Sequence, residues 1–387
     1  MRQLPTVKFQ EDDREDFCRK GAKIIHRDSV ISQVKIHKPH RNRLLILSLI
    51  ILLVLTSGCK KVGHSPFKAP KIRFITTENL HSVVTLGQED VLIIGDYGTI
   101  YHSSDDGKNW EKQETGTENH LYHSSFIDNQ NGWICGFLGT ILHTSNGGKT
   151  WEQQESSTQR HLFSIHFIDR THGWAVGDMR TVVATLDGGS TWAPIMKEAD
   201  ITYYSVCFPD PRKGWIVGEF GTILHTADGG KTWRSQDCKD IEPPDEGKWS
   251  MPKPSLYSVY FKDNEKGWIS GIEGIILTTD DGGMNWKKIL TKSEYSIFSL
   301  QLKGEKGWGV GAKGNYLVSL NRGKSWNYKV DVIKTRFWLQ DLSFRDEKDG
   351  FVVGARGTVI CTRNGGETWE MLSGISYEMP EFKMPEF

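Results

Sequence analysis

The sequence predicts an all-β fold, a seven-bladed β-propeller of four-stranded blades with Asp-box hairpins. Three observations predict it. A turn motif of fixed pattern occurs seven times, and apolar strand-like stretches recur in step with it. The chain also has 40 glycines and 14 tryptophans but few long amphipathic stretches. Its 387 residues allow two or three ordinary domains, but this composition favours one large all-β domain.

The turn motif is the Asp box, Ser/Thr-x-Asp/Asn-x-Gly-x-x-Trp. The acidic or amide residues of the boxes are Asp105, Asn146, Asp187, Asp228, Asp281, Asn321 and Asn364. The closing tryptophans are Trp110, Trp151, Trp192, Trp233, Trp286, Trp326 and Trp369. They are spaced by 41, 41, 41, 53, 40 and 43 residues. A period of about 40 residues is typical of one propeller blade.

Each residue type of the box has a physical role in a tight hairpin. We expect Asp or Asn to accept hydrogen bonds from backbone N–H groups one or two residues ahead. Glycine supplies the positive φ that a compact turn needs. Tryptophan buries a large apolar surface between strands or blades. We therefore interpret the boxes as structural and not as an aromatic platform for a ligand.

The four strands of a repeat follow one another in a fixed order. A first strand such as 162–167 alternates bulky residues, and the pattern D-x-x-x-G-W then leads into the second strand. The stretch G-T-I-L-x-T is the third strand, as in 221–226, and the box tryptophan begins the fourth. If the first strand runs from the top face downward, the boxes lie on the bottom face. The turns between second and third strands then lie on the top face, together with the links between blades.

The N-terminal part has the pattern of a secretion signal. Residues 44–55 are apolar except for Ser48 and follow a basic flank. Twelve helical residues span roughly 18 Å, which is short of a ~30 Å hydrocarbon core and typical of a signal-peptide apolar region. The sequence Thr-Ser-Gly-Cys59 that follows resembles a bacterial lipobox, so we expect Cys59 to be lipidated. An uncleaved signal anchor is the alternative.

These features divide the chain into four parts. Residues 1–58 are an N-terminal extension and signal sequence, 59–70 a linker, 71–375 the propeller and 376–387 a flexible tail. Either kind of anchor places the propeller outside the cytoplasm. We expect a membrane-anchored lipoprotein of the bacterial inner or outer membrane. Two segments compete to close the ring, 71–74 before the first blade and 368–371 at the end of the seventh.

The complete repeat, D-x-x-x-G-W-x-V-G-x-x-G-T-I-L-x-T-x-D-G-G-x-T-W, extends over residues 72–373. It resembles the repeat of the photosystem II stability/assembly factor family, whose members are seven-bladed propellers. The resemblance implies a non-catalytic scaffold that holds a newly inserted membrane subunit, so the expected partner is a membrane protein or complex. Members of that family use an arginine-rich surface patch, and those arginines lie outside the repeat that aligns with this sequence.

A surface lipoprotein that binds or hydrolyses glycans is the alternative function, because Asp boxes also occur in sialidases and xyloglucan hydrolases. Sialidases need an arginine triad and a tyrosine nucleophile with a glutamate partner, and they have six blades. Xyloglucan hydrolases use two facing propellers. One ring of seven boxes supplies neither arrangement. We therefore expect a protein that is not an enzyme and assign no catalytic residue.

We expect no metal, cofactor or nucleic acid. The six cysteines form no C-x-x-C pair. His102, His143 and His225 hold the same position in three blades, so they are spread around the ring beyond the reach of one metal ion. The 48 basic and 48 acidic side chains balance, which gives no electrostatic reason to expect nucleic acid.

The top face is the predicted partner-binding face. Some of its turns have apolar residues where turns are usually polar, and two arginines could pair with carboxylates of a partner. The insertion 238–254 accounts for the 53-residue spacing, and it is either a contact loop with an exposed tryptophan or a tolerated surface insertion. This mixed apolar and cationic composition is that of a protein interface. The residues concerned are Tyr97, Leu138, Phe220, Arg180, Arg356 and Trp249.

Overall fold

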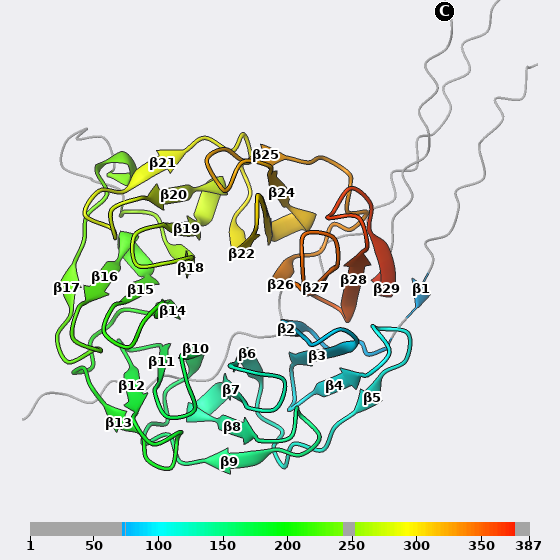
Figure 1. The fold of residues 1–387 in the computed structure, drawn as a ribbon, viewed down its shortest axis with the longest axis horizontal. Coiled ribbons are helices and arrows are strands. Elements are labelled where there is room, and N and C mark those ends of the chain that lie inside the picture. The colour runs from blue at the N-terminus through cyan, green and yellow to red at the C-terminus, as the bar shows by residue number, and fades with distance from the viewer. Residues whose placement is uncertain (1–71, 74, 243–251, 376–387) are drawn as a thin grey trace, which may run out of the picture. The chain divides into compact units, whose positions relative to one another are not determined.

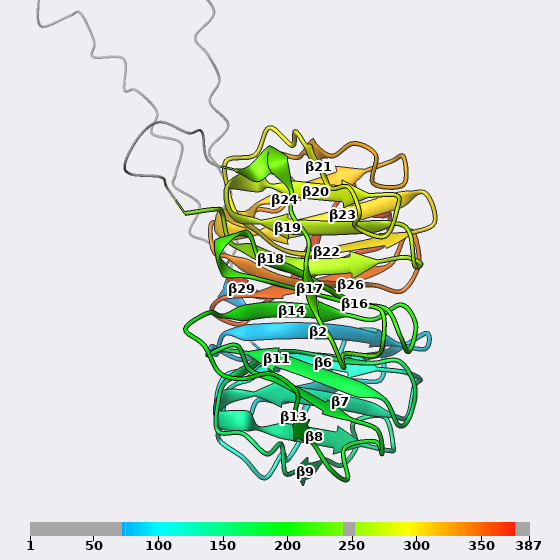
Figure 2. The same ribbon diagram turned by 90° about the vertical axis from the view of Figure 1, so that its left-hand side faces the viewer.

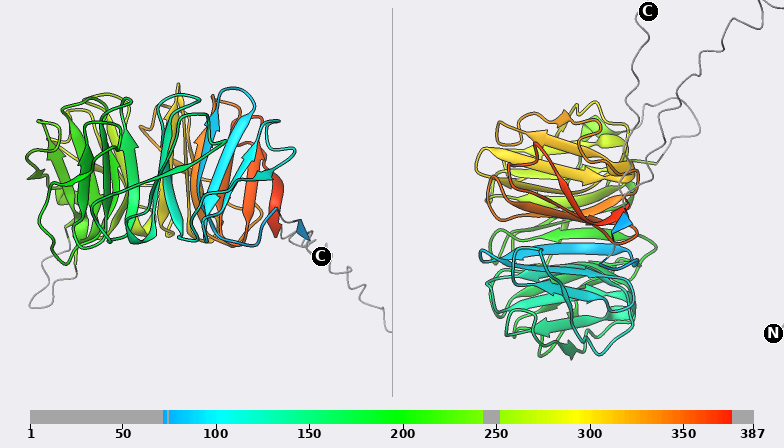
Figure 3. Two further views of the ribbon diagram at one scale, coloured as in Figure 1. Left: turned by 90° about the horizontal axis from the view of Figure 1, so that it is seen from below. Right: turned by 90° about the vertical axis from the view of Figure 1, so that its right-hand side faces the viewer.

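Seven antiparallel sheets are arranged in a ring in the computed structural model, which describes residues 72–73, 75–242 and 252–375 (Figure 1). Six sheets have four strands and the seventh has five. The four strands of a blade follow one another in chain order from the channel outward, as Figure 1 shows. Figures 2 and 3 show the same blades edge-on, with their strands lying side by side. The seven-bladed propeller predicted from the repeats is confirmed.

The strands of blades 1 to 4 are β2 (Leu80–Leu86), β3 (Asp90–Gly95), β4 (Ile100–Ser103) and β5 (Glu111–Lys112); β6 (Leu121–Phe126), β7 (Gly132–Gly136), β8 (Ile141–Thr144) and β9 (Glu152–Gln154); β10 (Leu162–Phe167), β11 (Gly173–Gly177), β12 (Val182–Thr185) and β13 (Ala193–Pro194); and β14 (Tyr203–Cys207), β15 (Gly214–Gly218), β16 (Ile223–Thr226) and β17 (Arg234–Ser235). Those of blades 5 to 7 are β18 (Leu256–Phe261), β19 (Gly267–Gly271), β20 (Ile276–Thr279) and β21 (Lys287–Ile289); β22 (Ile297–Lys303), β23 (Lys306–Gly311), β24 (Tyr316–Ser319) and β25 (Asn327–Tyr328); and β26 (Leu339–Phe344), β27 (Gly350–Gly354), β28 (Thr358–Thr362) and β29 (Glu370–Ile375), with β1 (Ile72–Arg73) added outside β29.

Short 3-10 turns accompany the strands, namely η1 (Phe137–Gly139), η2 (Glu219–Gly221), η3 (Lys239–Ile241), η4 (Ile272–Gly274) and η5 (Ala312–Gly314). Within the described ranges, none of the helices has the length and apolar character needed to cross a membrane. The cysteines of this part of the chain, Cys135, Cys207, Cys238 and Cys361, are all buried and free.

The core of the ring is built on the second strand of each blade. Every residue of β7, β11, β15, β19 and β27 is buried. The tryptophan of the G-W pair lies in this strand, and Trp133 is only 1% exposed. The glycine before it is required because an aromatic ring of the first strand packs against its Cα. A Cβ added to Gly132 would lie 2.3 Å from the ring of Phe126.

The Asp boxes form the hairpins between the third and fourth strands, and their hydrogen bonds differ from the expected ones. In blade 3 the Thr185 hydroxyl donates to Asp187 Oδ1 at 2.8 Å and accepts from the Gly189 N–H at 2.8 Å. Asp187 Oδ1 accepts from the N–H of Thr191, at 2.9 Å. The carboxylate therefore accepts a hydrogen bond from a residue four positions ahead and not one or two positions ahead. This bond spans the whole turn and ends at the residue before the box tryptophan.

Five of the seven box tryptophans pack edge-on against the phenylalanine ring at the end of their own blade's first strand. Trp192, for example, lies with its ring centroid 5.7 Å from that of Phe167 and the two planes 83° apart. Trp192, Trp286 and Trp326 are buried, and the other four box tryptophans are partly buried. In the structure, the box tryptophans therefore pack against the strands of the propeller.

The first strands of neighbouring blades are joined by side chains as well as by apolar packing. In blade 4 the Ser205 hydroxyl accepts a hydrogen bond from the N–H of Val259 in blade 5, at 3.2 Å. Asp341 of blade 7 connects three blades. It accepts from the N–H of Val83 in blade 1 at 3.1 Å and from the Ser299 hydroxyl of blade 6 at 2.8 Å.

The ring closes in the seventh blade with both of the candidate segments. β29 is the fourth strand of its own blade, and β1 pairs antiparallel with it as a fifth strand. The N–H of Ile75 donates to the buried hydroxyl of Ser373 at 2.9 Å, just after β1. The start and the end of the described chain are thereby joined in one sheet.

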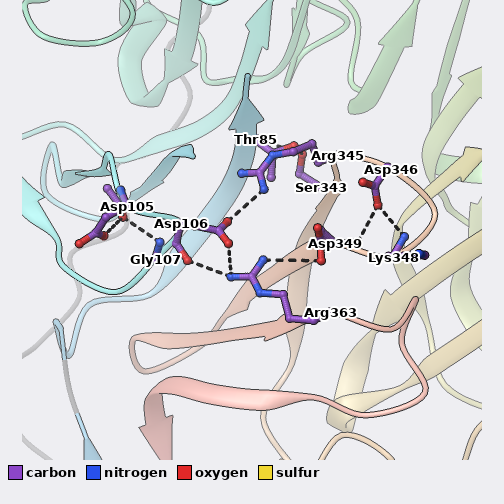
Figure 4. A network of polar contacts seen from close by, with 11 residues as sticks. Thr85, Asp105, Asp106, Gly107, Ser343, Arg345, Asp346, Lys348, Asp349 and Arg363 are labelled. Carbon is purple, nitrogen blue, oxygen red and sulfur yellow. Dashed lines mark hydrogen bonds and ion pairs between the residues drawn. The ribbon is translucent and has the colours of Figure 1, made fainter. Parts of the chain in front are cut away.

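A second contact that closes the ring joins blade 1 to blade 7 at the Asp-box end of their interface (Figure 4). Asp106 of blade 1 forms ion pairs with two arginines of blade 7, at 3.0 Å from Arg345 Nη1 and 2.7 Å from Arg363 Nη2. The Arg363 guanidinium also lies over the ring of Phe351, 5.2 Å from its centroid. Sequence reasoning missed this contact, although Asp106 departs from a glycine that recurs at its position. That glycine is Gly147, Gly188, Gly229, Gly282 and Gly365 in five other boxes.

Candidate binding site

Strand pairing assigns the turns to two opposite faces. Leu80, at the start of β2, pairs with Gly95, at the end of β3, and the other blades repeat this register. The starts of the first strands, the turns after the second strands and the links between blades therefore share the top face. The Asp boxes and the turns before G-W share the bottom face.

Tyr97, Leu138 and Phe220 occupy one equivalent position in the top-face turns of three blades. Their side chains are 61%, 50% and 54% exposed. Each has a positive φ, 55°, 51° and 54°, which is uncommon for residues other than glycine. The turns thus hold apolar side chains outward in solvent at a conformational cost.

Arg180 and Arg356 are also exposed on top-face turns, in blades 3 and 7. Arg356 holds the position of Leu138, and its guanidinium lies 4.9 Å from the centroid of the Phe337 ring. Arg180 holds the next position along its turn, where the other turns have glycine. The two arginines are therefore not equivalent, and they are separated around the ring.

Two of the predicted site residues, Trp249 and Cys59, lie outside the described residues. The described ends of the 238–254 insertion are anchored to the propeller. Cys238 and Ile241 are buried, and Lys253 pairs with Glu242 at 3.2 Å. The carbonyl of Pro254 accepts a hydrogen bond from the Gly221 N–H of a top-face turn. This insertion therefore begins and ends against the propeller.

The top of the channel is lined by a set of residues that sequence reasoning missed, and we call this set the collar. Each first strand contributes its second residue. Together they surround a cavity of about 260 Å³. The collar residues are His81, Tyr122, Phe163, Tyr204, Tyr257, Phe298 and Gln340.

Consecutive rings of the collar are in contact from blade 1 to blade 6. The five successive centroid distances are 5.4, 5.4, 6.1, 5.3 and 5.4 Å, with planes 42° to 76° apart. Tilted and edge-on arrangements at such distances are the preferred ones for aromatic pairs. Comparing the second residue of each first strand across the repeats would have revealed the collar, because this position is aromatic in five of the seven blades.

Carboxylates stand behind the collar on blades 1, 3 and 4. Asp96, Asp178 and Glu219 each follow the glycine that ends the second strand. Glu219 Oε1 accepts a hydrogen bond from the Tyr204 hydroxyl at 3.4 Å. Burial, with a smaller contribution from Glu219, raises the pKa of Tyr204 to about 12.

Asp96 has the most partners of these carboxylates. Its Oδ1 lies 2.7 Å from Nε2 of His81 and 2.8 Å from Nδ1 of His120. Burial alone would raise the pKa of Asp96. Hydrogen bonds from His81 and Asn79, together with the charges of the two histidines, outweigh burial and lower that pKa to about 2. Asp96 is therefore ionised at neutral pH.

The bottom face has a different hollow, of about 390 Å³, between blades 5 and 6. Trp268 of blade 5 faces Leu302 of blade 6 there, where other blades place a phenylalanine against the G-W tryptophan. Basic side chains stand around its rim, namely Lys262, Lys266, Lys287, Arg322 and Lys324. The bottom face also exposes the apolar residues Leu186, Met284 and Leu320, one in each of three boxes.

The histidines considered as metal ligands are engaged separately in their own blades. His102 Nε2 lies 2.7 Å from Asp90 Oδ1, whereas His143 stacks on Trp133 with centroids 4.8 Å apart. His225 packs on Trp215 at the same centroid distance. Across the described ranges, no three His, Cys, Asp or Glu side chains are grouped so that they could hold a metal ion.

Fold and site together define a single Asp-box propeller with an aromatic-lined channel mouth. A family model described as photosynthesis system II assembly factor YCF48 matches residues 109–162, 148–248, 248–334 and 327–385, well over half of the chain. The chain belongs to this family, as the resemblance of its repeat predicted. A search of curated protein sequences finds no match.

Solved structures share the fold. "YCF48 bound to D1 peptide" is 20% identical with a TM-score of 0.61, over 75% of this chain and 95% of that one. YCF48 from Cyanidioschyzon merolae is 16% identical with a TM-score of 0.60, over 76% and 99%. A GH74 enzyme of Niastella koreensis is 12% identical with a TM-score of 0.61, over 78% of this chain but only 55% of that one.

Proposed function

We propose that this protein is a non-catalytic, extracytoplasmic assembly scaffold that binds a segment of a membrane protein or complex on its top face. The observation that carries the proposal is the collar, an open aromatic cavity with exposed apolar side chains on the turns of the same face. Membership of the YCF48 family supports it, and so does the similarity to the propeller of YCF48 bound to D1 peptide.

Hydrogen bonds hold the backbone of the top-face turns. The N–H of Leu138 donates to His161 Nδ1 at 3.2 Å, and the N–H of Gly98, next to Tyr97, donates to the Asn119 carbonyl at 2.8 Å. A turn backbone fixed in this way loses little conformational freedom when a partner binds, which favours affinity. Exposed aromatic residues and arginines are the types enriched at the centres of protein interfaces.

The proposed place of action depends on Cys59 and the linker at 59–70, which lie outside the described residues. A lipid on Cys59 would keep the propeller beside its membrane partner. Cys59→Ala tests this part alone. We expect the full chain to partition with membranes and the variant to lose that partitioning. A variant that partitions like the wild type contradicts the lipid anchor.

Glycan binding is the second candidate, and the observation in its favour is the set of aromatic rings at the channel mouth, together with the shared fold of GH74 enzymes. Glycans and polypeptides can be separated in one experiment. The full chain is assayed against a glycan panel for binding and hydrolysis, beside a crosslinking pull-down from its own membranes. We expect a membrane protein in the pull-down and no glycan signal above a control protein.

Matched variants locate the face. The top-face variant replaces Tyr97, Leu138 and Phe220 by serine, and the bottom-face control replaces Leu186, Met284 and Leu320 by serine. All six side chains are at least half exposed, so neither variant opens the core. We expect the top-face variant to reduce partner recovery at least tenfold and the control to leave it unchanged. Equal recovery from both variants contradicts the proposed face.

A further inference from the structure

We propose that the collar receives one positively charged side chain, a lysine or an arginine, of the bound polypeptide. This inference rests on the proposed function and specifies the chemistry of its partner. A cation is attracted to the electron-rich faces of aromatic rings, and several rings around one cavity are the arrangement that binds ammonium groups in aromatic cages. Five aromatic side chains and one histidine surround the cavity here.

The charges behind the collar have the matching sign. Asp178 and Asp96 act electrostatically on Tyr122, and Glu219 acts on both Tyr204 and Tyr257. Oδ1 of Asp178 is buried and has no hydrogen-bond partner. A buried carboxylate oxygen without a partner is costly unless a donor or a positive charge reaches it. Arg160 already acts electrostatically on Asp178, and a positive charge bound in the cavity, which Asp178 does not itself line, would add to that attraction.

No lysine or arginine of the described residues lines the cavity. Two cations of the same face lie over aromatic rings outside the collar. Lys313 Nζ is 5.0 Å from the centroid of Tyr295, and Arg356 is 4.9 Å from that of Phe337. The cavity of about 260 Å³ has room for one basic side chain and not for a folded element. The remaining collar position, Gln340, adds an amide that can accept a hydrogen bond.

The test compares two peptides that differ only in charge. The full chain in a non-ionic detergent is titrated by calorimetry with acetyl-hexaarginine amide and with the citrulline hexapeptide, whose side chains keep the shape but are neutral. We expect the arginine peptide to bind at least tenfold more tightly. Equal affinities would overturn the proposal. So would a hexaglutamate peptide that binds more tightly than the arginine peptide and loses its affinity in Tyr257→Leu.

Collar variants assign the binding to the cavity. Tyr257→Leu removes a ring, and we expect it to weaken the arginine peptide at least tenfold, whereas Tyr257→Phe keeps the ring and should retain most of the affinity. Tyr328→Leu, on β25 at the outer edge of blade 6, is the matched control and should change nothing. If Tyr257→Leu and Tyr328→Leu behave alike, or if Tyr257→Phe loses as much affinity as Tyr257→Leu, the proposal is wrong.

Carboxylate variants test the charge. Asp178→Asn with Glu219→Gln keeps the size of both side chains, and the amide oxygen introduced at position 219 can still accept from the Tyr204 hydroxyl. We expect this pair to weaken the arginine peptide at least fivefold and to leave the citrulline peptide unchanged, and equal effects on both peptides would overturn the role of charge. Failure of the proposed function looks different. In that case the arginine peptide still binds the collar, but the top-face serine variant recovers its partner as well as the wild type does.

Discussion

The indole ring of Trp133 in blade 2 lies flat on the phenyl ring of Phe167 in blade 3, with centroids 3.6 Å apart and planes 6° from parallel. The same pair, at the same centroid distance, joins three further interfaces as Trp174 with Phe208, Trp215 with Phe261 and Trp308 with Phe344. At the interface of blades 5 and 6 the partner of Trp268 is Leu302, and the bottom-face hollow lies there.

This relationship predicts opposite effects for two exchanges of the same residue types. Phe167→Leu should lower the free energy of unfolding by about 2 kcal/mol, since it removes a buried ring and leaves a cavity. Leu302→Phe should raise it by about 1 kcal/mol, because the new ring can stack on Trp268 and fill the hollow. Urea unfolding of both variants measures this. A Leu302→Phe variant as destabilised as Phe167→Leu would contradict the stacking account.

The Asp box predicts a sharp difference between two substitutions of one buried residue. Thr185→Val keeps the volume but removes the hydroxyl that bonds Asp187 and the Gly189 N–H, which should cost about 1–2 kcal/mol of stability. Thr185→Ser keeps the hydroxyl, and Ser103 and Ser319 hold this position in two other boxes. Thermal unfolding of both variants provides the comparison. Similar losses from valine and serine would mean that the methyl group, and not the hydroxyl, stabilises the turn.

Ring closure at Asp106 predicts a second contrast. Asp106→Ala leaves the half-buried guanidinium of Arg345 without its carboxylate, and we expect a loss of about 2 kcal/mol. Asp106→Gly removes the same carboxylate, but glycine adopts the positive φ of 62° without steric strain. The glycine variant should therefore lose about 0.5–1 kcal/mol less stability than the alanine variant. Urea unfolding in low and high salt tests both variants. Alanine and glycine variants of wild-type stability would show that β1 alone closes the ring.

His166 predicts how stability depends on pH. Burial lowers the pKa of His166 to about 4, even though its Nε2 donates to the Phe208 carbonyl at 2.9 Å. The unfolded chain binds this proton below a pH of about 6.5 and the folded chain does not until about pH 4, so stability falls as the pH decreases through this window. His166→Gln keeps a donor for the carbonyl. Between pH 7.5 and 5 the wild type should lose up to about 2 kcal/mol more than the variant. Parallel losses in urea unfolding would exclude His166 as the cause.

The repeat predicted the ring because its glycines and tryptophans have roles that only this packing explains. The Cα of the G-W glycine packs against an aromatic ring, as at Gly132. The Ser or Thr hydroxyl of the box bonds the backbone of its own turn, as at Thr185. The collar was not predicted because it depends on the register of seven strands, and its members differ in type, from His81 to Gln340. For ring closure the sequence left two candidate segments open, because β1 has only two residues. The Asp106 contact was missed because it depends on a departure from the repeat.

The central claim is that the face opposite the Asp boxes binds a membrane protein. Site-specific photocrosslinking tests it most directly. A benzophenone amino acid replaces either Leu138 on a top-face turn or Leu186 in an Asp box, both exposed, in the full chain within its own membranes. The account predicts that position 138 captures one membrane protein, identified by mass spectrometry, and that position 186 does not. Capture of that protein from position 186 and not from position 138 would contradict it.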